Sequence, residues 1–381
     1  MSAVVIMGAA ESEEIGKLPD VSTLELHVQS ARRALADAGL TLDQVDGIAS
    51  VSTGGPGPVA VSHALGITPT YVDGTSVGGS SFLFHVRHAV AAIRAGHAHV
   101  VLITHGESGR SRVGAAPWAR PNDSAQAQFE MPYGILGPPT TFTIPALRFM
   151  RETGNTFEQM AQVAVAQRRW SSRNTRAMFR EEITVDDVLD SRVVAWPFTL
   201  LMCCLVTDGG GALVITSKEF AQAHGTDKPL VEVAGTGEAA TTPLVSQMND
   251  MSTCEQFRLS SRAAFQEAGM GPADIDHLMI YDAFAHVPLF GLEDMGFVGR
   301  GESGAFVADG HTSPGGSLPM NTNGGGLSYT HTGMYGMFAI QESVRQLRGE
   351  AEAQVDGVAT SLVLGNGGMF MSAATLVLTR S

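Results

Sequence analysis

Two stretches of the chain carry the same pattern of apolar and polar positions. Residues 31–50 read ARRALADAGLTLDQVDGIAS and residues 261–280 read SRAAFQEAGMGPADIDHLMI, so they align at a constant offset of 230 residues. In each stretch the apolar spacing predicts a helix that ends at a glycine, Gly39 or Gly269, which can adopt a left-handed cap. An acidic turn and a short apolar strand follow. We therefore expect the chain to consist of two related halves.

Each half also contains a glycine-rich turn, an apolar helix and an apolar strand in that order. In the first half the turn at residues 78–81 precedes FLFHVRHAVAAIRAG and HVVLITHG, and in the second half GMYGMFAIQESVRQLRG precedes TSLVLGNGG. Each half then closes with a strand, GALVIT near 211–216 and SAATLVL near 372–378. Strands that alternate with such helices predict sheets covered by helices. The predicted fold class is α/β, with halves at residues 1–222 and 223–381.

A long insertion, at about residues 108–192, interrupts the first half. It is rich in Gly, Pro and Ala over residues 109–145 and has helical periodicity from about 157 to 173. Long loops without a core of their own usually cover binding sites. We expect this insertion to cover a site, and the alternative is a surface excursion that only packs against the core.

Composition excludes several classes of protein. With 44% hydrophobic and only 16% charged residues, the 381-residue chain can bury a large core and is not disordered. Its 24 basic residues against 38 acidic ones give a net charge of −14, and no basic run is present, which argues against a nucleic-acid partner. No apolar segment is long enough to predict a membrane span, and the N-terminus lacks the basic region of a secretion signal. We expect a cytoplasmic protein.

The three cysteines predict neither a disulfide framework nor a metal site. Cys203 and Cys204 are adjacent in an apolar run, and Cys254 stands alone. The spacing of zinc ligands is absent from this set. A reducing compartment fits this usage best.

Five segments, in order along nearly the whole chain, resemble the thiolase superfamily, particularly its sterol carrier protein type branch. They are VDGTSVGGSSFLFHVRH, PFTLLMCCLVTDGGGALVIT, MIYDAFAHVP, NTNGGGLSYTHTGMYG and LVLGNGG. In that family the corresponding segments hold the nucleophilic cysteine, the end of the first half, a His-Asp-Cys-Phe motif, a stretch ending in Gly-His-Pro, and a C-terminal glycine loop. The resemblance implies a thiolase fold, in which two βαβαβαββ halves form a layered αβαβα core.

The departures from the thiolase pattern bear on function. The position of the nucleophilic cysteine falls on Ser76, the His-Asp-Cys-Phe motif begins at Tyr281, and Gly365 stands where many thiolases have a second cysteine. Acyl transfer by thiolases needs a cysteine thiolate. No catalytic cysteine is left, and we expect Cys203 and Cys204 to pack in a core strand.

Three residues are candidates for proton transfer. His331 matches the Gly-His-Pro histidine, which by resemblance donates a hydrogen bond to a thioester oxygen. Tyr281 and Tyr335 are two of only five tyrosines, and both fall where the family builds its active site. A phenol with its ordinary pKa of about 10 needs a neighbour in order to act as a base, and His331 is suited to that task. The alternative is that the two tyrosines only pack at loop ends.

Main-chain groups complete the expected site. By resemblance, the amide of Ser76 and the glycine loop around Gly367 form an oxyanion hole. The glycines around Gly325 are expected to let the backbone approach the substrate, and Asp282 to fix the loop that aims Tyr281. Ser76 precedes a helix N-terminus and is an alternative nucleophile, although no base is paired to it in the sequence.

A site without a thiolate that still binds a coenzyme A thioester favours retro-aldol cleavage of a β-hydroxyacyl thioester. That reaction needs a base, an oxyanion hole for the enolate and an acid for the α-carbon. The motifs are similar to those of thiolase-like aldolases of steroid side-chain degradation. The resemblance implies a steroid CoA ester that yields a 17-ketosteroid and propionyl-CoA, with no cofactor beyond the CoA of the substrate.

The same resemblance implies a homodimer and a partner protein with an OB fold and a zinc ribbon. Three alternatives stay open at this point. The first is an acyltransferase that uses Ser76, and the second is a non-catalytic carrier of acyl-CoA or lipid. The third is a subunit without catalytic activity, whose partner protein is the enzyme.

Overall fold

The computed structural model describes residues 2–51, 56–114 and 123–381, and its main sheet runs through both halves of the chain. Within those residues the strand order is β3-β2-β4-β7-β1-β8-β11-β10-β9, nine strands in all. The first five strands in this order come from the first half and the last four from the second. The predicted α/β class with two related halves is confirmed.

The first half builds a mixed sheet in which β2 is parallel to β3 and β4, whereas β7 is antiparallel to β4 and β1. Its strands are β1 (Val4–Glu11), β2 (Gly47–Ser50), β3 (Tyr71–Asp73), β4 (Val100–Ser108) and β7 (Asp208–Ser217). Its helices are α1 (Thr23–Ala38), α2 (Pro58–Leu65), α3 (Ser81–Arg94) and α9 (Lys218–His224). The expected boundary between the halves, at residues 222 and 223, falls within α9.

The second half repeats this arrangement, with β8, β9, β10 and β11 in the places of β1, β2, β4 and β7. Its strands are β8 (Val231–Ala240), β9 (His277–Ile280), β10 (Thr360–Gly367) and β11 (Ser372–Arg380). Its helices are α10 (Glu255–Ala268), α11 (His286–Asp294), α12 (Ser303–Ala308), α13 (Gly325–Ser328) and α14 (Gly336–Arg348). The two half-sheets join where β1 pairs with β8 at Val5 and Ile6.

The repeated stretches fold alike. Helices α1 and α10 end at Gly39 and Gly269, whose φ angles of 69° and 67° are left-handed. The side chain of Asp46 then accepts hydrogen bonds from the main chain at the start of β4, and that of Asp276 does the same at the start of β10. The acidic turns therefore cap equivalent strands, which explains why both halves carry an aspartate at this point.

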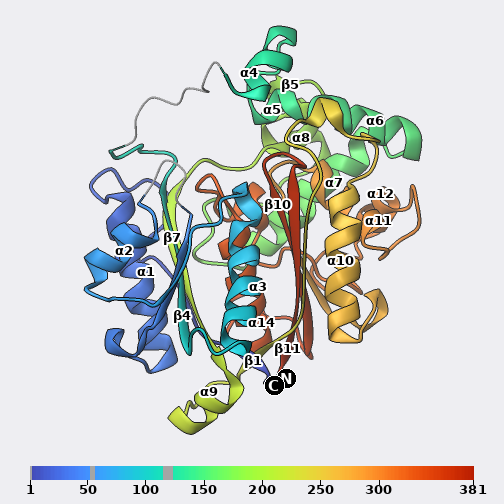
Figure 1. The fold of residues 1–381 in the computed structure, drawn as a ribbon. Helices are drawn as coiled ribbons and strands as arrows, with labels where there is room; N and C mark the ends of the chain where they lie inside the picture. The colour runs from blue at the N-terminus through green and yellow to red at the C-terminus, as the bar shows by residue number, and fades with distance from the viewer. Residues whose placement is uncertain (1, 52–55, 115–122) are drawn as a thin grey trace.

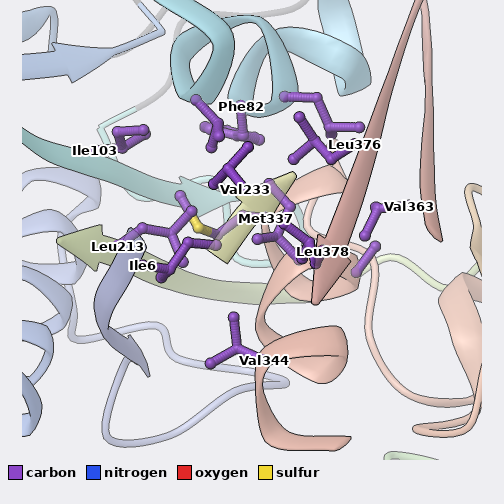
Figure 2. Close-up of a cluster of buried hydrophobic side chains, with 14 of the residues drawn as sticks. Ile6, Phe82, Ile103, Leu213, Val233, Met337, Val344, Val363, Leu376 and Leu378 are labelled. Carbon is purple, nitrogen blue, oxygen red and sulfur yellow. The ribbon is translucent and has the colours of Figure 1, made fainter. Parts of the chain in front are cut away.

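Helices α3 and α14 form a central layer between the two half-sheets, while α1 and α2 lie outside the first and α10 outside the second (Figure 1). Phe82 of α3 and Met337 of α14 belong to the same buried cluster as Leu213 of β7 and Leu376 of β11 (Figure 2). This is the expected αβαβα layering, and burying apolar surface in its central layer is the main driving force for the fold.

The N-termini of the two central helices meet. A Cβ on Gly336, the first residue of α14, would lie 2.3 Å from the carbonyl oxygen of Gly79, just before α3. Such an approach is open only to glycine. The two helices therefore direct the positive ends of their dipoles to one place in the core.

The insertion forms a helical cover over one end of the sheets (Figure 1). It extends past the expected end at residue 192, and its elements are α4 (Ala125–Phe129), α5 (Pro138–Thr141), α6 (Thr143–Thr153), α7 (Phe157–Ser171), α8 (Val185–Asp190), β5 (Val193–Ala195) and β6 (Phe198–Thr199). The helix expected over about 157–173 is α7. Among the described residues, none of the helices combines the length and apolarity needed to cross a bilayer.

Cys203 and Cys204 do not lie in a core strand as expected, although Cys203 packs against the hydrophobic core as expected. They follow a short 3-10 turn, Leu200–Met202, and both side chains are partly exposed. The N–H of Cys204 donates to the carbonyl of Ala283 at 2.9 Å, two residues after Tyr281. The apolar run is interrupted because this segment must cross from the insertion to β7.

Candidate active site

The structure brings the three candidate residues for proton transfer together. Tyr281 directly follows β9, and His331 and Tyr335 lie in the loop between α13 and α14. The Tyr281 hydroxyl is 2.9 Å from Nε2 of His331, and the main-chain N–H of Tyr335 donates to that hydroxyl at 3.2 Å. The two tyrosine rings meet edge to face with centroids 5.9 Å apart. Residues separated by about 50 positions thus form one hydrogen-bonded group.

All three side chains are buried and neutral. Tyr281 is 4% exposed, Tyr335 0% and His331 8%. Burial raises the pKa of both phenols well above the usual value and lowers the pKa of His331 to about 4. A neutral imidazole accepts at the ring nitrogen that carries no proton, so Tyr281 donates to His331 in the tautomer whose proton is on Nδ1.

The second phenol faces a different group. The Tyr335 hydroxyl donates to Oδ1 of Asn323 at 2.7 Å, and the N–H of Gly325 donates to the same oxygen at 2.9 Å. An amide oxygen is an acceptor but not a base at neutral pH. The two tyrosines are therefore not equivalent, because only Tyr281 has a basic group at its proton.

Gly79 makes room for Tyr281. A Cβ at this position would lie 2.3 Å from Cε2 of the Tyr281 ring and 2.6 Å from its hydroxyl oxygen. The phenol consequently lies directly against the turn that opens α3. A developing negative charge at this place would be stabilised by the N-termini of α3 and α14.

The glycine loop that follows β10 packs on the same turn. A Cβ on Gly78 would lie 2.5 Å from the nitrogen of Gly368, and one on Gly367 would lie 1.9 Å from the carbonyl oxygen of Val77. Ser76 immediately precedes this contact, and its side chain is exposed. Ser80, rather than Ser76, is the N-cap residue of α3. The main chain next to Ser76 and the Gly367 loop are thus brought together, and their role as an oxyanion hole stays a prediction.

Gly325 lies elsewhere in the site. Its φ is 66°, and a Cβ there would lie 2.2 Å from a carboxyl oxygen of Asp282. The carboxyl of Asp282 accepts from the N–H groups of Gly326 and Leu327 at 2.7 and 3.1 Å. Asp282 therefore holds the glycine turn of α13, whose Gly325 N–H also binds Asn323, the partner of Tyr335.

Two residues near the site were not among the sequence-based candidates. Asn323, the partner of Tyr335, is fully buried and lies just before the glycine run. Glu107 is the penultimate residue of β4, and its Oε1 would lie 2.4 Å from a Cβ on Gly333, in the loop that carries His331. Burial raises the pKa of Glu107 to about 8. The only sequence signal for Glu107 was that it is an acidic residue directly after the apolar strand HVVLITHG.

The described part of the chain contains no cluster of three or more His, Cys, Asp or Glu residues suited to hold a metal ion. The cysteines are poor nucleophiles at neutral pH, since burial raises the pKa of Cys203 to about 12 and raises that of Cys204 as well. Proton transfer by phenol and imidazole is the chemistry that the buried group Tyr281, His331 and Tyr335 can perform.

Comparisons with known proteins agree with this geometry. Residues 237–380 match the family model described as Thiolase C-terminal domain-like. A protein of Mycobacterium tuberculosis named 17-hydroxy-3-oxo-4-pregnene-20-carboxyl-CoA lyase is 33% identical over 380 residues, covering 97% of each chain. The chain belongs to the thiolase superfamily. Within it, the chain is a carbon–carbon lyase of the aldolase type, since the steroid side-chain-cleaving aldolase of Thermomonospora curvata is also 31% identical over 97% of this chain and 95% of the relative.

A solved structure and one further relative complete the comparison. The structure called Ltp2-ChsH2(DUF35) aldolase matches this thiolase-superfamily lyase with a TM-score of 0.91 and 30% identity, covering 99% of this chain and 98% of the other. An acetyl-CoA acetyltransferase of Methanothermobacter thermautotrophicus is 30% identical over the full length of both chains. Lyases and acyltransferases therefore both occur among the relatives of this chain.

Proposed function

We propose that the protein cleaves a β-hydroxyacyl-CoA thioester by a retro-aldol reaction. The observation that carries the proposal is the hydrogen-bonded group of Tyr281, His331 and Tyr335 at the meeting point of the α3 and α14 N-termini. This group offers protons and proton acceptors where the related thiolases offer thiolates. A reaction that moves only protons and one carbon–carbon bond suits such a site.

The proposed steps balance without any further reactant. The β-hydroxyl proton passes to the oxygen of Tyr281 as the phenol proton passes to Nε2 of His331. The carbon–oxygen bond becomes a carbonyl, and the α,β carbon–carbon bond breaks and leaves its electron pair on the thioester enolate. Main-chain N–H groups near Gly367 and the two helix N-termini stabilise the enolate oxygen. Tyr335 is the group available to deliver a proton to the α-carbon. Its phenolate then takes one proton from solvent and the protonated His331 releases one to solvent, so the net proton count is unchanged.

The proposed substrate is a steroid side-chain CoA ester with a tertiary hydroxyl on the D ring. The names of the relatives from M. tuberculosis and T. curvata support this class. The test is incubation with 17-hydroxy-3-oxo-4-pregnene-20-carboxyl-CoA and detection of a 17-ketosteroid and propionyl-CoA. Formation of both products in equal amounts supports the proposal, and an unchanged substrate under conditions that preserve the fold contradicts it.

We also propose a homodimer and a second protein of the OB-fold and zinc-ribbon type as partners. The similar solved structure carries two protein names, Ltp2 and ChsH2, which is consistent with a heteromeric complex. On the insertion, Phe129, Tyr133 and Trp196 are 62%, 84% and 58% exposed, as expected for a surface that a partner covers. Co-expression with such a protein should raise a low basal turnover. Full turnover by the chain alone would remove this part of the proposal and leave the aldolase assignment intact.

Acyl transfer through Ser76 is the second candidate, and the relative named acetyl-CoA acetyltransferase favours it. It predicts an acyl-enzyme that mass spectrometry detects after incubation with an acyl-CoA. The aldolase proposal predicts no adduct on Ser76 and no thiolysis of acetoacetyl-CoA. A non-catalytic carrier would bind the same thioesters and release no product from any of them.

A further inference from the structure

The loop between β10 and β11 has an unusual backbone. Met369 and Phe370 are consecutive non-glycine residues with φ angles of 62° and 66°. L side chains rarely adopt this left-handed region, because the Cβ crowds the neighbouring carbonyl oxygen. Such strain persists only where the surrounding structure holds it. The loop directly follows Gly367, the last residue of β10 and the one expected to contribute to the oxyanion hole.

An aromatic cage holds Phe370. The Phe370 side chain is 0% exposed. The centroid of the Phe370 ring lies 5.0 to 5.8 Å from the centroids of four other rings. These belong to Phe142 of the insertion, Phe257 of α10, and His286 and Phe290 of α11. The main chain of Phe370 is also bound, since its N–H donates to Asn366 at 3.2 Å and its carbonyl accepts from the amide of Gln256. The cage thus fixes both the ring and the backbone of this residue.

One ring of the cage, that of His286, lowers the stability of the fold rather than raising it. Its side chain is fully buried, and neither ring nitrogen has a hydrogen-bond partner within the described residues. Burial lowers its pKa to about 3, so the ring is neutral in the folded protein. Unpartnered buried polar atoms destabilise a fold, whereas an apolar ring in the same space would not. A strained loop and an unsatisfied histidine therefore meet in one cluster.

The other side of the loop reaches the candidate active site. Gly367 and Gly368 pack against the turn before α3, where the additional Cβ of an alanine at Gly78 would lie 2.5 Å from the nitrogen of Gly368. That turn continues into Gly79, which lies against Tyr281. A displacement of the loop by about 1 Å would change the direction of the Gly367 and Gly368 amides, and misplacements of that size reduce catalysis strongly.

We propose that Phe370 is a positioning residue, held by the cage so that the Gly367 loop stays in the strained conformation that presents its amides to the enolate oxygen. The inference rests on the proposed retro-aldol function. Because Phe142 lies between α5 and α6, the insertion takes part in setting the loop. The strain is thereby maintained by contacts from three parts of the chain: the insertion, α10 and α11.

The insertion offers a matched pair of variants to test this role. Phe142 and Phe149 are 1% and 0% exposed and lie seven positions apart, but only Phe142 is among the ring partners of Phe370, whereas Phe149 stacks on Phe290 at 4.2 Å. The experiment compares Phe142→Leu, Phe149→Leu and Phe370→Leu. It measures thermal stability, hydrogen exchange of the peptide covering residues 366–371, and kcat and KM for 17-hydroxy-3-oxo-4-pregnene-20-carboxyl-CoA.

We expect Phe142→Leu and Phe370→Leu to accelerate exchange of this peptide and to lower kcat at least about tenfold with KM nearly unchanged, because oxyanion contacts act in the transition state. Phe149→Leu, which contacts Phe290 but not Phe370, should lose a similar amount of thermal stability with a much smaller change in kcat and in the exchange rate. Equal kcat losses in Phe142→Leu and Phe149→Leu, or unchanged exchange in Phe142→Leu, would overturn the role of the cage.

The two proposals fail in different ways. Absence of cleavage by the wild-type protein overturns the proposed function, whereas the exchange rates report on the cage independently of activity. If Phe370→Leu does not fold, the comparison of Phe142→Leu with Phe149→Leu still tests whether the aromatic cage positions the Gly367 loop.

Discussion

The two halves of this protein share one frame but contribute unequally to the site. Each half has a helix with a left-handed glycine cap, an aspartate that binds the start of the next central strand, and a buried helix in the middle layer. The second half adds the candidate side chains for proton transfer, Tyr281, His331 and Tyr335. The first half adds the glycine turn before α3, against which the Tyr281 ring packs.

One pair of equivalent positions makes this difference concrete. Glu107 and Gly367 each lie seven residues after the strand residue whose N–H binds the capping aspartate, Val100 or Thr360. In the first half this place holds a buried carboxyl, and in the second it holds a glycine whose main chain meets α3. Related backbones thus set where a residue stands, and the residue type decides whether the position offers a side chain or a main-chain group.

The largest expected effect comes from the second half. Tyr281→Phe and Tyr335→Phe keep the rings and remove only the hydroxyls, so CoA-thioester binding should survive while turnover falls about 100- to 10,000-fold. Turnover at saturating substrate and a separate binding measurement check this. If both variants keep near wild-type turnover, the tyrosines are packing residues and the proposed mechanism is wrong. The two losses need not add, because the residues act as a unit.

The first half should matter through its shape. Gly79→Ala places a methyl group 2.3 Å from the Tyr281 ring, so the phenol must move away from His331. We expect turnover to fall on the order of 100-fold, as misplacements of about 1 Å do elsewhere. Gly137→Ala is the matched control, because the nearest atom to its new Cβ is 4.0 Å away. Equal turnover of the two variants would show that the turn before α3 does not position Tyr281.

The shared frame predicts equal effects on stability. Asp46→Ala and Asp276→Ala each remove a carboxylate that binds two main-chain N–H groups at the start of a central strand. Each should lower the free energy of unfolding by about 1 to 3 kcal/mol. Urea unfolding of both variants checks this, with turnover of the remaining folded protein unchanged. A large effect in only one half would contradict the structural equivalence.

The smallest expected effect is a change in pH dependence at Glu107. Burial raises its pKa from 4.5 to about 8, so between these values the folded protein holds a proton that the unfolded chain releases. Stability therefore falls as the pH rises through this range. Glu107→Gln cannot lose this proton, and its stability relative to the wild type should increase from pH 5.5 to pH 8. Urea midpoints at both pH values measure the shift, and parallel midpoints would exclude a buried neutral carboxyl.

Much of the fold could be predicted from local patterns in the sequence. The repeated stretches around Gly39 and Gly269, the two central helices and the helix α7 within the insertion all appear where the periodicity and the glycines place them. Helix caps and amphipathic spacing act over a few residues, so the sequence carries this information directly. The segment of Cys203 and Cys204 was misassigned, since an apolar run alone does not distinguish a core strand from a crossing segment.

What the sequence by itself determined about the site was the identity of Tyr281, His331 and Tyr335 and the lack of a thiolate at the positions that match thiolase motifs. Only the tertiary structure decided that the Tyr281 hydroxyl meets Nε2 of His331, that Tyr335 turns to Asn323, and that Phe370 packs against Phe142 of the insertion. The physical reason is that these contacts join residues far apart in the chain. Their geometry depends on strand order and on the packing of whole layers, which no local pattern encodes.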